Sequence, residues 1–216
     1  MPLFLLLMQM AAGENNGTRS RHVVQYSTTY DEIRYISCKI LAMTKSEVID
    51  ALNEKHQALY DWLESHPDEK WVEGPEGKWT TGEHIVHLVQ SASALYKGFL
   101  APKFLLKSQF GTNNRENRTY DEVVAKYQDK LAANPGVVAE VSKNMPEMTP
   151  ADKSTYIDKL EKEKLKLIKK FQKWSDKDLD TYLLPHPLMG RMTVREVVMW
   201  TAHHTEHHLQ TLQENY

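Results

Sequence analysis

Apolar side chains recur at the spacing of an α-helix along most of this 216-residue chain, whereas the alternating pattern of strands is nearly absent. The segment 44–65 shows the helical spacing most clearly. Its apolar stripe consists of Val48, Ile49, Leu52, Leu59 and Leu63. Thr44 or Ser46 can cap its first turn, and Pro67 stops it. The stripe predicts a helix that buries one side against other helices.

Four further segments carry the same periodicity and are expected to form helices. They are 81–100, 119–134, 151–174 and a last helix from 194 nearly to the end. Two of them begin with a capping box, in which a threonine caps the helix and a glutamate three residues later bonds back. The pairs are Thr80–Glu83 and Thr193–Glu196. Between the helices, prolines and glycines predict an irregular crossover at 101–118 and a loop at 184–192.

No internal repeat, low-complexity tract or glycine-rich phosphate loop occurs in the sequence. Four or five helices in about 170 residues, joined by connections of mixed length, predict an all-α helical bundle. Hydrophobic residues make up 41% of the chain and charged residues 26%, which is typical of a soluble globular protein with one core. We place this bundle domain at 43–216.

The first part of the chain differs from the rest. Residues 13–42 are polar and mostly lack periodicity, so we expect 1–42 to be a poorly ordered N-terminal extension. Its start, MPLFLLLMQMAAG, superficially resembles a signal peptide. However, it lacks a positive n-region and is too short to span a bilayer. We therefore expect a cytoplasmic protein without a membrane segment, with secretion as the weaker alternative.

Charge and cysteine content exclude several other classes. The formal net charge of −2 gives no basic field for nucleic acid or an anionic membrane. The basic run at 159–174 is interrupted by Glu161 and Glu163, which is typical of a solvated helix face. Cys38 is the only cysteine, which excludes an intramolecular disulfide and any metal site with several cysteine ligands.

The last expected helix holds four histidines within six positions, in the stretch MWTAHHTEHHLQTL. At about 100° per residue, His204 and His208 share the face expected to be buried with Val197. His203 and His207 turn toward the polar flank. Two histidines four residues apart on one face suit two ligands of a single ion. The alternative is that each ring bonds a carbonyl or a carboxylate in the core.

A third ligand would decide between these readings, and the expected helix at 81–100 offers two histidines. Periodicity favours His84, which lies on the side of Leu88. His87 lies closer to Ser91 and Ala94, small residues that could equally make room for an ion or a ligand. Because this helix is apolar around much of its girth, its spacing alone leaves both histidines open.

Two motifs in this order carry a family resemblance. Trp79, followed by threonine, is eight residues before His87, which is followed by leucine. The last helix reads H-T-E-H-H-L from His204, so that His204 and His208 form an H-x-x-x-H pair. These stretches resemble the DinB-like metalloprotein superfamily, which includes bacillithiol and mycothiol transferases and mycothiol-dependent maleylpyruvate isomerase. The resemblance covers about residues 43–214.

The resemblance implies a DinB-like four-helix bundle, here with an additional short helix. It also implies a divalent metal site made of His87, His204 and His208, so it selects His87 rather than His84. The family often has glutamine three residues after the last ligand. Thr211 stands at that place in this chain, a difference that bears on the type of substrate more than on metal binding.

Three neutral imidazoles suit Zn²⁺ or Ni²⁺ and leave positions open for water or a substrate. Such an ion lowers the pKa of a water to about 7, and it would also favour the thiolate form of an incoming thiol. We therefore expect a metal-dependent hydrolase or a thiol-dependent transferase acting on a small molecule, with a low-molecular-weight thiol as one partner. No catalytic residue is assigned. The alternative is a non-catalytic bundle, with a structural ion or none, that acts through association, for example as a homodimer.

Another motif, H-x-x-E-H at 203–207, is the signature of inverzincin proteases. Glu206 lies away from the buried stripe, which argues against a protease. Other aromatic residues receive simpler interpretations. We expect core packing for Trp79 and Trp200, a turn for His186, and solvated side chains for His56 and His66.

Overall fold

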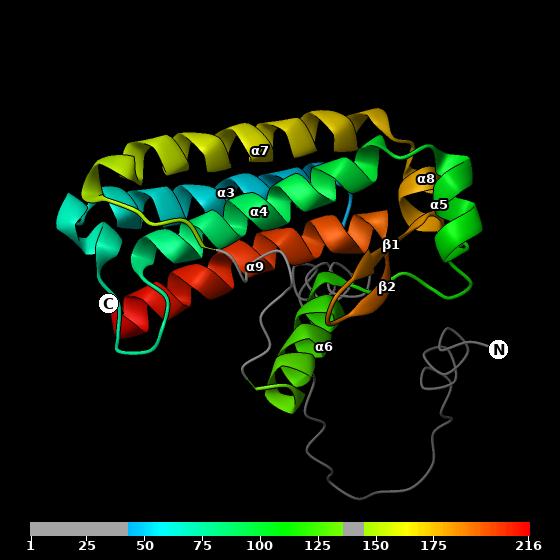
Figure 1. Ribbon diagram of the computed structural model, residues 1–216. Helices are drawn as coiled ribbons and strands as arrows, with labels where there is room; N and C mark the ends of the chain where they lie inside the picture. Colours follow the sequence, from blue (N-terminus) through cyan, green and yellow to red (C-terminus); the bar gives the residue numbers. More distant parts are fainter. Residues whose placement is uncertain (1–42, 136–144) are drawn as a thin grey trace, which may run out of the picture. The chain divides into compact units, whose positions relative to one another are not determined.

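Four long helices dominate the computed structural model, which describes residues 43–135 and 145–216 (Figure 1). They are α3 (Lys45–Glu64), α4 (Thr81–Leu100), α7 (Lys153–Lys173) and α9 (Val194–Asn215). Helix α3 packs mainly on α9, and α4 packs mainly on α7. The sequence colours show that α3 and α9 run in one direction and that α4 and α7 run in the other. The connection between the parallel helices α4 and α7 is therefore a crossover along the bundle.

The expected all-α bundle is confirmed for the described part of the chain. The expected extension at 1–42 lies outside the described residues. None of the helices at 43–135 and 145–216 combines the length and the apolar character that crossing a bilayer requires.

Threonine capping boxes set the start of four helices. In each box the threonine hydroxyl accepts from the backbone N–H of a glutamate three residues later, and that carboxylate accepts from the threonine N–H. The pairs are Thr44–Glu47, Thr80–Glu83, Thr119–Glu122 and Thr193–Glu196. The boxes predicted at Thr80 and Thr193 are thus confirmed.

The described part of the connection from α4 to α7 contains two α-helices. Helix α5 (Lys103–Phe110) lies where the sequence predicts an irregular crossover, and that prediction is wrong for this part. Pro102 precedes the helix, and Gly111, with a φ of 78°, ends it. Helix α6 (Tyr120–Ala133) packs on α9. Two short 3-10 helices, η1 (Asp68–Val72) and η3 (Pro150–Asp152), contact each other.

A short helix and a β-hairpin precede α9. Helix α8 (Asp176–Thr181) is followed by β1 (Leu183–His186), which pairs antiparallel with β2 (Gly190–Thr193). The loop predicted at 184–192 is therefore a hairpin, and the prediction is wrong there. Each strand has only four residues, too few to show an alternating pattern. Gly190 takes a φ of 74° at the turn, a conformation that favours glycine.

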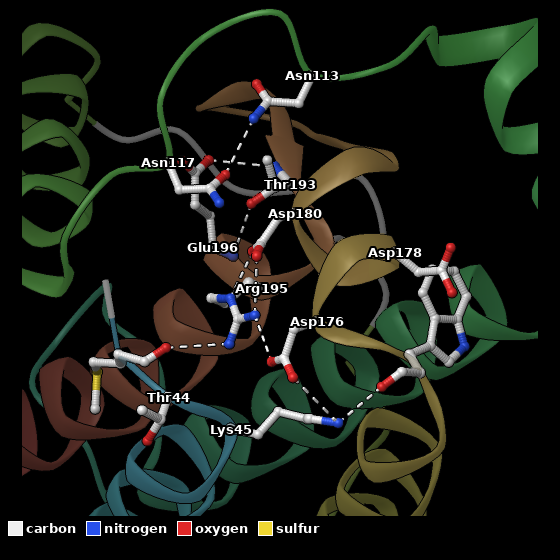
Figure 2. A network of polar contacts seen from close by, with 12 residues as sticks. Thr44, Lys45, Asn113, Asn117, Asp176, Asp178, Asp180, Thr193, Arg195 and Glu196 are labelled. Carbon is white, nitrogen blue, oxygen red and sulfur yellow. Dashed lines mark hydrogen bonds and ion pairs between the residues drawn. The ribbon is translucent and has the colours of Figure 1, made fainter. Parts of the chain in front are cut away.

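Arg195 ties the start of α9 to two neighbouring elements (Figure 2). Its buried guanidinium donates to Asp180, with 2.6 Å between Nε and Oδ1, and to Asp176, with 2.8 Å between Nη2 and Oδ1. Its Nη1 donates to the carbonyl of Met43, just before α3, at 3.1 Å. Lys45 in α3 forms a further ion pair with Asp176. The first turn of α9 is thus fixed against both α8 and α3.

Glu196, the next residue, anchors the end of the crossover. Its side chain is completely buried, and its two carboxylate oxygens each accept from the Arg115 guanidinium at 2.7 Å. Arg118 adds a bond from its backbone N–H at 2.9 Å and one from Nη1 at 3.1 Å. Burial would raise the pKa of Glu196, but the hydrogen bonds and charges of the two arginines outweigh it, so the pKa is lowered. The carboxylate therefore stays ionised at neutral pH.

Two apolar clusters fill the interior of the bundle, and buried polar residues separate them along the long helices. The separating residue is His56 in α3 and Lys164 in α7, and α9 contributes several, among them His204 and His208. Helix α4 contributes His84 and His87, which are also buried. A buried polar group needs a partner, because without one it costs about 1–3 kcal/mol. These buried polar residues form a layer across the bundle, between the two apolar clusters.

Candidate metal centre

The three histidines that the resemblance selects lie on two helices. His87 is near the middle of α4, and His204 and His208 are one turn apart on α9. Their side chains are 7%, 3% and 6% exposed, respectively. The structure therefore brings into the interior the pair that helical spacing predicts and the third residue that the resemblance implies.

The ring nitrogens of these histidines converge. Nε2 of His204 lies 3.1 Å from Nε2 of His87 and 3.0 Å from Nε2 of His208. Ligand nitrogens from all three residues lie within 4.8 Å of one another. In a tetrahedral zinc site, Zn–N bonds of about 2.0–2.1 Å place neighbouring nitrogens about 3.3 Å apart. The residues present therefore fit one divalent ion with little movement.

Their protonation states also suit metal binding. Burial, with a smaller effect of His207, lowers the pKa of His87 to about 4. Burial and the neighbouring histidines lower the pKa of His204 and His208 well below the ordinary range. All three imidazoles are therefore neutral at pH 7, and each can offer a lone pair to an ion.

His84 contacts the ring nitrogen of His208 that does not face the other two histidines. Nδ1 of His84 lies 2.8 Å from Nδ1 of His208, and its Nε2 lies 3.1 Å from the Tyr216 hydroxyl. That hydroxyl donates to the backbone carbonyl of Trp79. If Nε2 of His208 faces an ion, its Nδ1 carries a proton and donates to His84, whose Nε2–H then donates to Tyr216. All hydrogen bonds in this series then point the same way, from His208 to His84, to Tyr216 and to the Trp79 carbonyl. They fix the orientation of the His208 ring.

Two tryptophans flank the converging rings. The Trp200 ring stacks on His204, with centroids 4.4 Å apart and planes at 20°. The Trp79 ring lies 4.9 Å from His87 and is nearly parallel to His208 at 6.1 Å. Trp200 is buried, as expected, and Trp79 is partly buried. Both also contact the histidines and line a pocket, so core packing alone does not describe them.

This pocket has a volume of about 1000 Å³, and all three converging histidines lie in its wall. Pockets that bind small molecules have volumes of about 300–1000 Å³, so this pocket is at the upper end of that range. The centre is therefore buried on the protein side and accessible to a ligand on the other.

The neighbouring histidines of α9 take other roles. His207 is partly buried and lines the pocket. His203 is buried, which contradicts its expected place on a polar flank, and its Nδ1 lies 3.4 Å from Glu206. Glu206 also pairs with Lys55 at 3.0 Å. Among the described residues, the group placed to hold an ion contains none of the three residues that define the H-x-x-E-H motif, which are His203, Glu206 and His207.

Three predictions for isolated histidines have different outcomes. His186 is the last residue of β1 rather than part of the turn at 187–189, so the expected turn is wrong by one residue; its Nδ1 accepts from the N–H groups of Leu188 and Met189 in that turn, and its ring also lines the pocket. His66 is partly buried rather than solvated. His56 is buried, so the expectation of a solvated ring is wrong. Its face of α3 packs on α9, and its Nδ1 lies 2.8 Å from the Leu52 carbonyl.

The family model of the DinB superfamily matches residues 51–212 of the chain. The chain belongs to the DinB superfamily. No curated protein and no solved structure matches it. In this DinB-superfamily chain the matched segment includes all three converging histidines, whereas Tyr216 lies beyond it.

The sequence motifs did not predict the series of hydrogen bonds that runs from His208 through His84 to Tyr216. One signal was present: His208, Leu212 and Tyr216 follow each other at intervals of four, which places Tyr216, the residue just after α9, in line with the face of His208. The spacing that favoured His84 also had a real cause. That residue is buried beside the three converging histidines, although it contacts the outer nitrogen of His208 rather than the point on which the three rings converge.

Proposed function

We propose that this DinB-superfamily protein is a divalent-metal-dependent enzyme acting on a small molecule, and that hydrolysis is the reaction its site supports best. One observation carries the proposal. Three neutral, buried imidazoles converge on one point in the wall of a pocket of about 1000 Å³.

The donor set favours Zn²⁺ or Ni²⁺. Imidazole nitrogens suit these ions, whereas Mg²⁺ and Ca²⁺ prefer carboxylate and carbonyl oxygens. When bound, such an ion would act as a Lewis acid and lower the pKa of a water to about 7. His87, His204 and His208 would hold it, and His84 would orient the ring of His208. Trp79 and Trp200 would keep the ligand rings in place and exclude bulk water from that side.

The number of ligands favours catalysis over a structural ion. Structural zinc sites are closed by four protein ligands, whereas catalytic sites have three and keep a position open. In the described part of the chain, three residues form the group, and they border a pocket. The non-catalytic alternative, in which the bundle acts through association as a homodimer, would require neither the pocket nor the open side.

Thiol-dependent transfer is the second candidate reaction. The pocket has room for two small reactants, and Lys78 in its wall could face an anionic group of a low-molecular-weight thiol. The described residues contain no cysteine, because the single Cys38 lies outside them. A thiol nucleophile would therefore have to come from a cosubstrate rather than from these residues.

Metal analysis combined with activity measurement tests the proposal. We expect the purified protein, loaded with Zn²⁺ or Ni²⁺, to bind one ion per chain and to hydrolyse members of a panel of esters and amides. A chelator and His204→Ala should each abolish turnover, whereas the control His66→Ala should retain it. A loaded protein that turns over thiol conjugates but no ester or amide would favour transfer. A loaded protein inactive on the entire panel would contradict the proposed enzyme.

A further inference from the structure

Small side chains form a groove along α4 that starts at the metal centre. Ser91, Ala94 and Gly98 follow His87 by four, seven and eleven residues, so all four share one face of the helix, and all four line the pocket. At about 1.5 Å of rise per residue, eleven residues span about 16 Å. The pocket therefore extends well beyond the three histidines, in a direction set by α4.

The far part of the groove is apolar. At Gly98 an added methyl group would lie 3.2 Å from Cδ2 of Leu184, which shows that the hairpin comes close to α4 there. Leu188 of the hairpin turn, Val197 of α9 and Leu131 of α6 line the other sides. A ligand that fills this part would exchange water for hydrocarbon contacts, worth about 25 cal/mol per Å² of buried apolar surface.

Charged groups are nearly absent from the wall. Among its described lining residues, Lys78 is the single lysine or arginine, and there is no aspartate or glutamate. Lys78 precedes Trp79 and therefore belongs to the histidine end rather than the hairpin end. Burial lowers the pKa of His186 to about 4, so this histidine is also neutral at pH 7. A charged group in the far part would find no counter-charge among these residues, which makes its burial costly.

We propose that the pocket binds an uncharged small molecule with an extended apolar body. The body lies along the groove of Ser91, Ala94 and Gly98, toward Leu184, and a polar group lies near His87. The identity of the reacting end rests on the proposed function. Binding of the apolar body does not, because the groove is formed by residues that take no part in holding an ion.

Two probes with the same ring skeleton test this inference. 1-Anilinonaphthalene is neutral, and 8-anilinonaphthalene-1-sulfonate carries one negative charge. Their binding is measured by fluorescence with the full-length protein, in a chelator and again after loading with Zn²⁺. In the chelator, we expect the neutral probe to bind roughly tenfold more tightly than the sulfonate, because the far groove offers no partner for the charge.

Matched variants locate the binding. Ala94→Phe fills the groove, and Ala58→Phe makes the same change at an exposed position of α3 that does not line the pocket. We expect Ala94→Phe to weaken neutral-probe binding roughly tenfold and Ala58→Phe to leave it within about twofold. Equal or tighter binding of the sulfonate in the chelator, or equal effects of the two variants, would overturn the inference. Neither result depends on turnover, so an inactive but probe-selective protein would contradict only the proposed function.

Discussion

Nδ1 of His84 lies 2.8 Å from Nδ1 of His208, and both residues are buried. The contact links a histidine outside the converging group of three to one that belongs to it. Because the Tyr216 hydroxyl donates to the Trp79 carbonyl, Nε2 of His84 donates to that hydroxyl and Nδ1 of His84 accepts from Nδ1 of His208, which leaves Nε2 of His208 free to face an ion.

Removing the acceptor at residue 84 should therefore weaken metal binding. We expect His84→Leu to lower Zn²⁺ affinity about 10–100-fold, the usual cost of losing such a partner. His84→Asn keeps an oxygen acceptor near the position of Nδ1 and should recover most of the affinity. Competitive titration against a chromophoric chelator measures both variants. Equal losses in the two variants would show that packing, rather than the hydrogen bond, is what His84 provides.

Burial of His56 should make the metal-free protein less stable in acid. Burial, assisted by the charge of Lys164 and opposed by Glu161 and the bond to the Leu52 carbonyl, lowers the pKa of His56 from 6.5 to about 4. The unfolded chain therefore takes up a proton between these pH values while the folded protein does not. Stability is unaffected by this group above pH 6.5 and declines as the pH falls toward 4.

A non-titrating substitution at this position isolates that effect. In His56→Gln, the decline of unfolding free energy between pH 6.5 and 4 should be shallower by up to about 1.4 kcal/mol per pH unit. Urea titrations at several pH values, in a chelator so that metal loss does not contribute, give the slopes. Parallel slopes for the variant and the wild type would refute a neutral, buried His56.

Loss of the Glu196 carboxylate should destabilise the fold far more than loss of a surface partner. Glu196→Gln leaves Arg115 and Arg118 without their shared, fully buried partner. We expect a loss of roughly 3 kcal/mol, at the low end for buried pairs because both arginines are partly exposed. Glu206→Gln, which breaks a partly exposed pair with Lys55, should cost less than about 1 kcal/mol. Chemical denaturation compares the two, and similar losses would contradict the anchoring role of Glu196.

The long helices and their starts were predictable because they depend on local signals. The apolar stripe of α3 and the capping boxes at Thr80 and Thr193 are readable within one turn or one helix. The His204–His208 pair was predictable for the same reason, since one rotation of about 100° per residue places both on a buried face. Helix α5 and the hairpin carry weaker signals, because each has eight residues or fewer per element.

The surroundings of α9 could not be predicted from its own periodicity. A helical wheel assumes one buried face, but every residue from Val194 to Thr205 is buried, since α3, α6, α8 and the hairpin all pack on this helix. This explains why His203 is buried despite its polar flank. His56 is buried for the corresponding reason, on the face of α3 that meets α9. Which faces meet depends on tertiary packing, which no single segment encodes.

The central claim is that one divalent ion is held jointly by His87, His204 and His208. Anomalous diffraction at the metal absorption edge, from crystals of the Zn²⁺-loaded protein, tests it most directly. We expect a single anomalous peak about 2.0–2.1 Å from Nε2 of each of the three rings, with Nδ1 of His208 still bonded to His84. A peak coordinated by His84 or His207 in place of one of the three, or no peak between α4 and α9, would contradict the account.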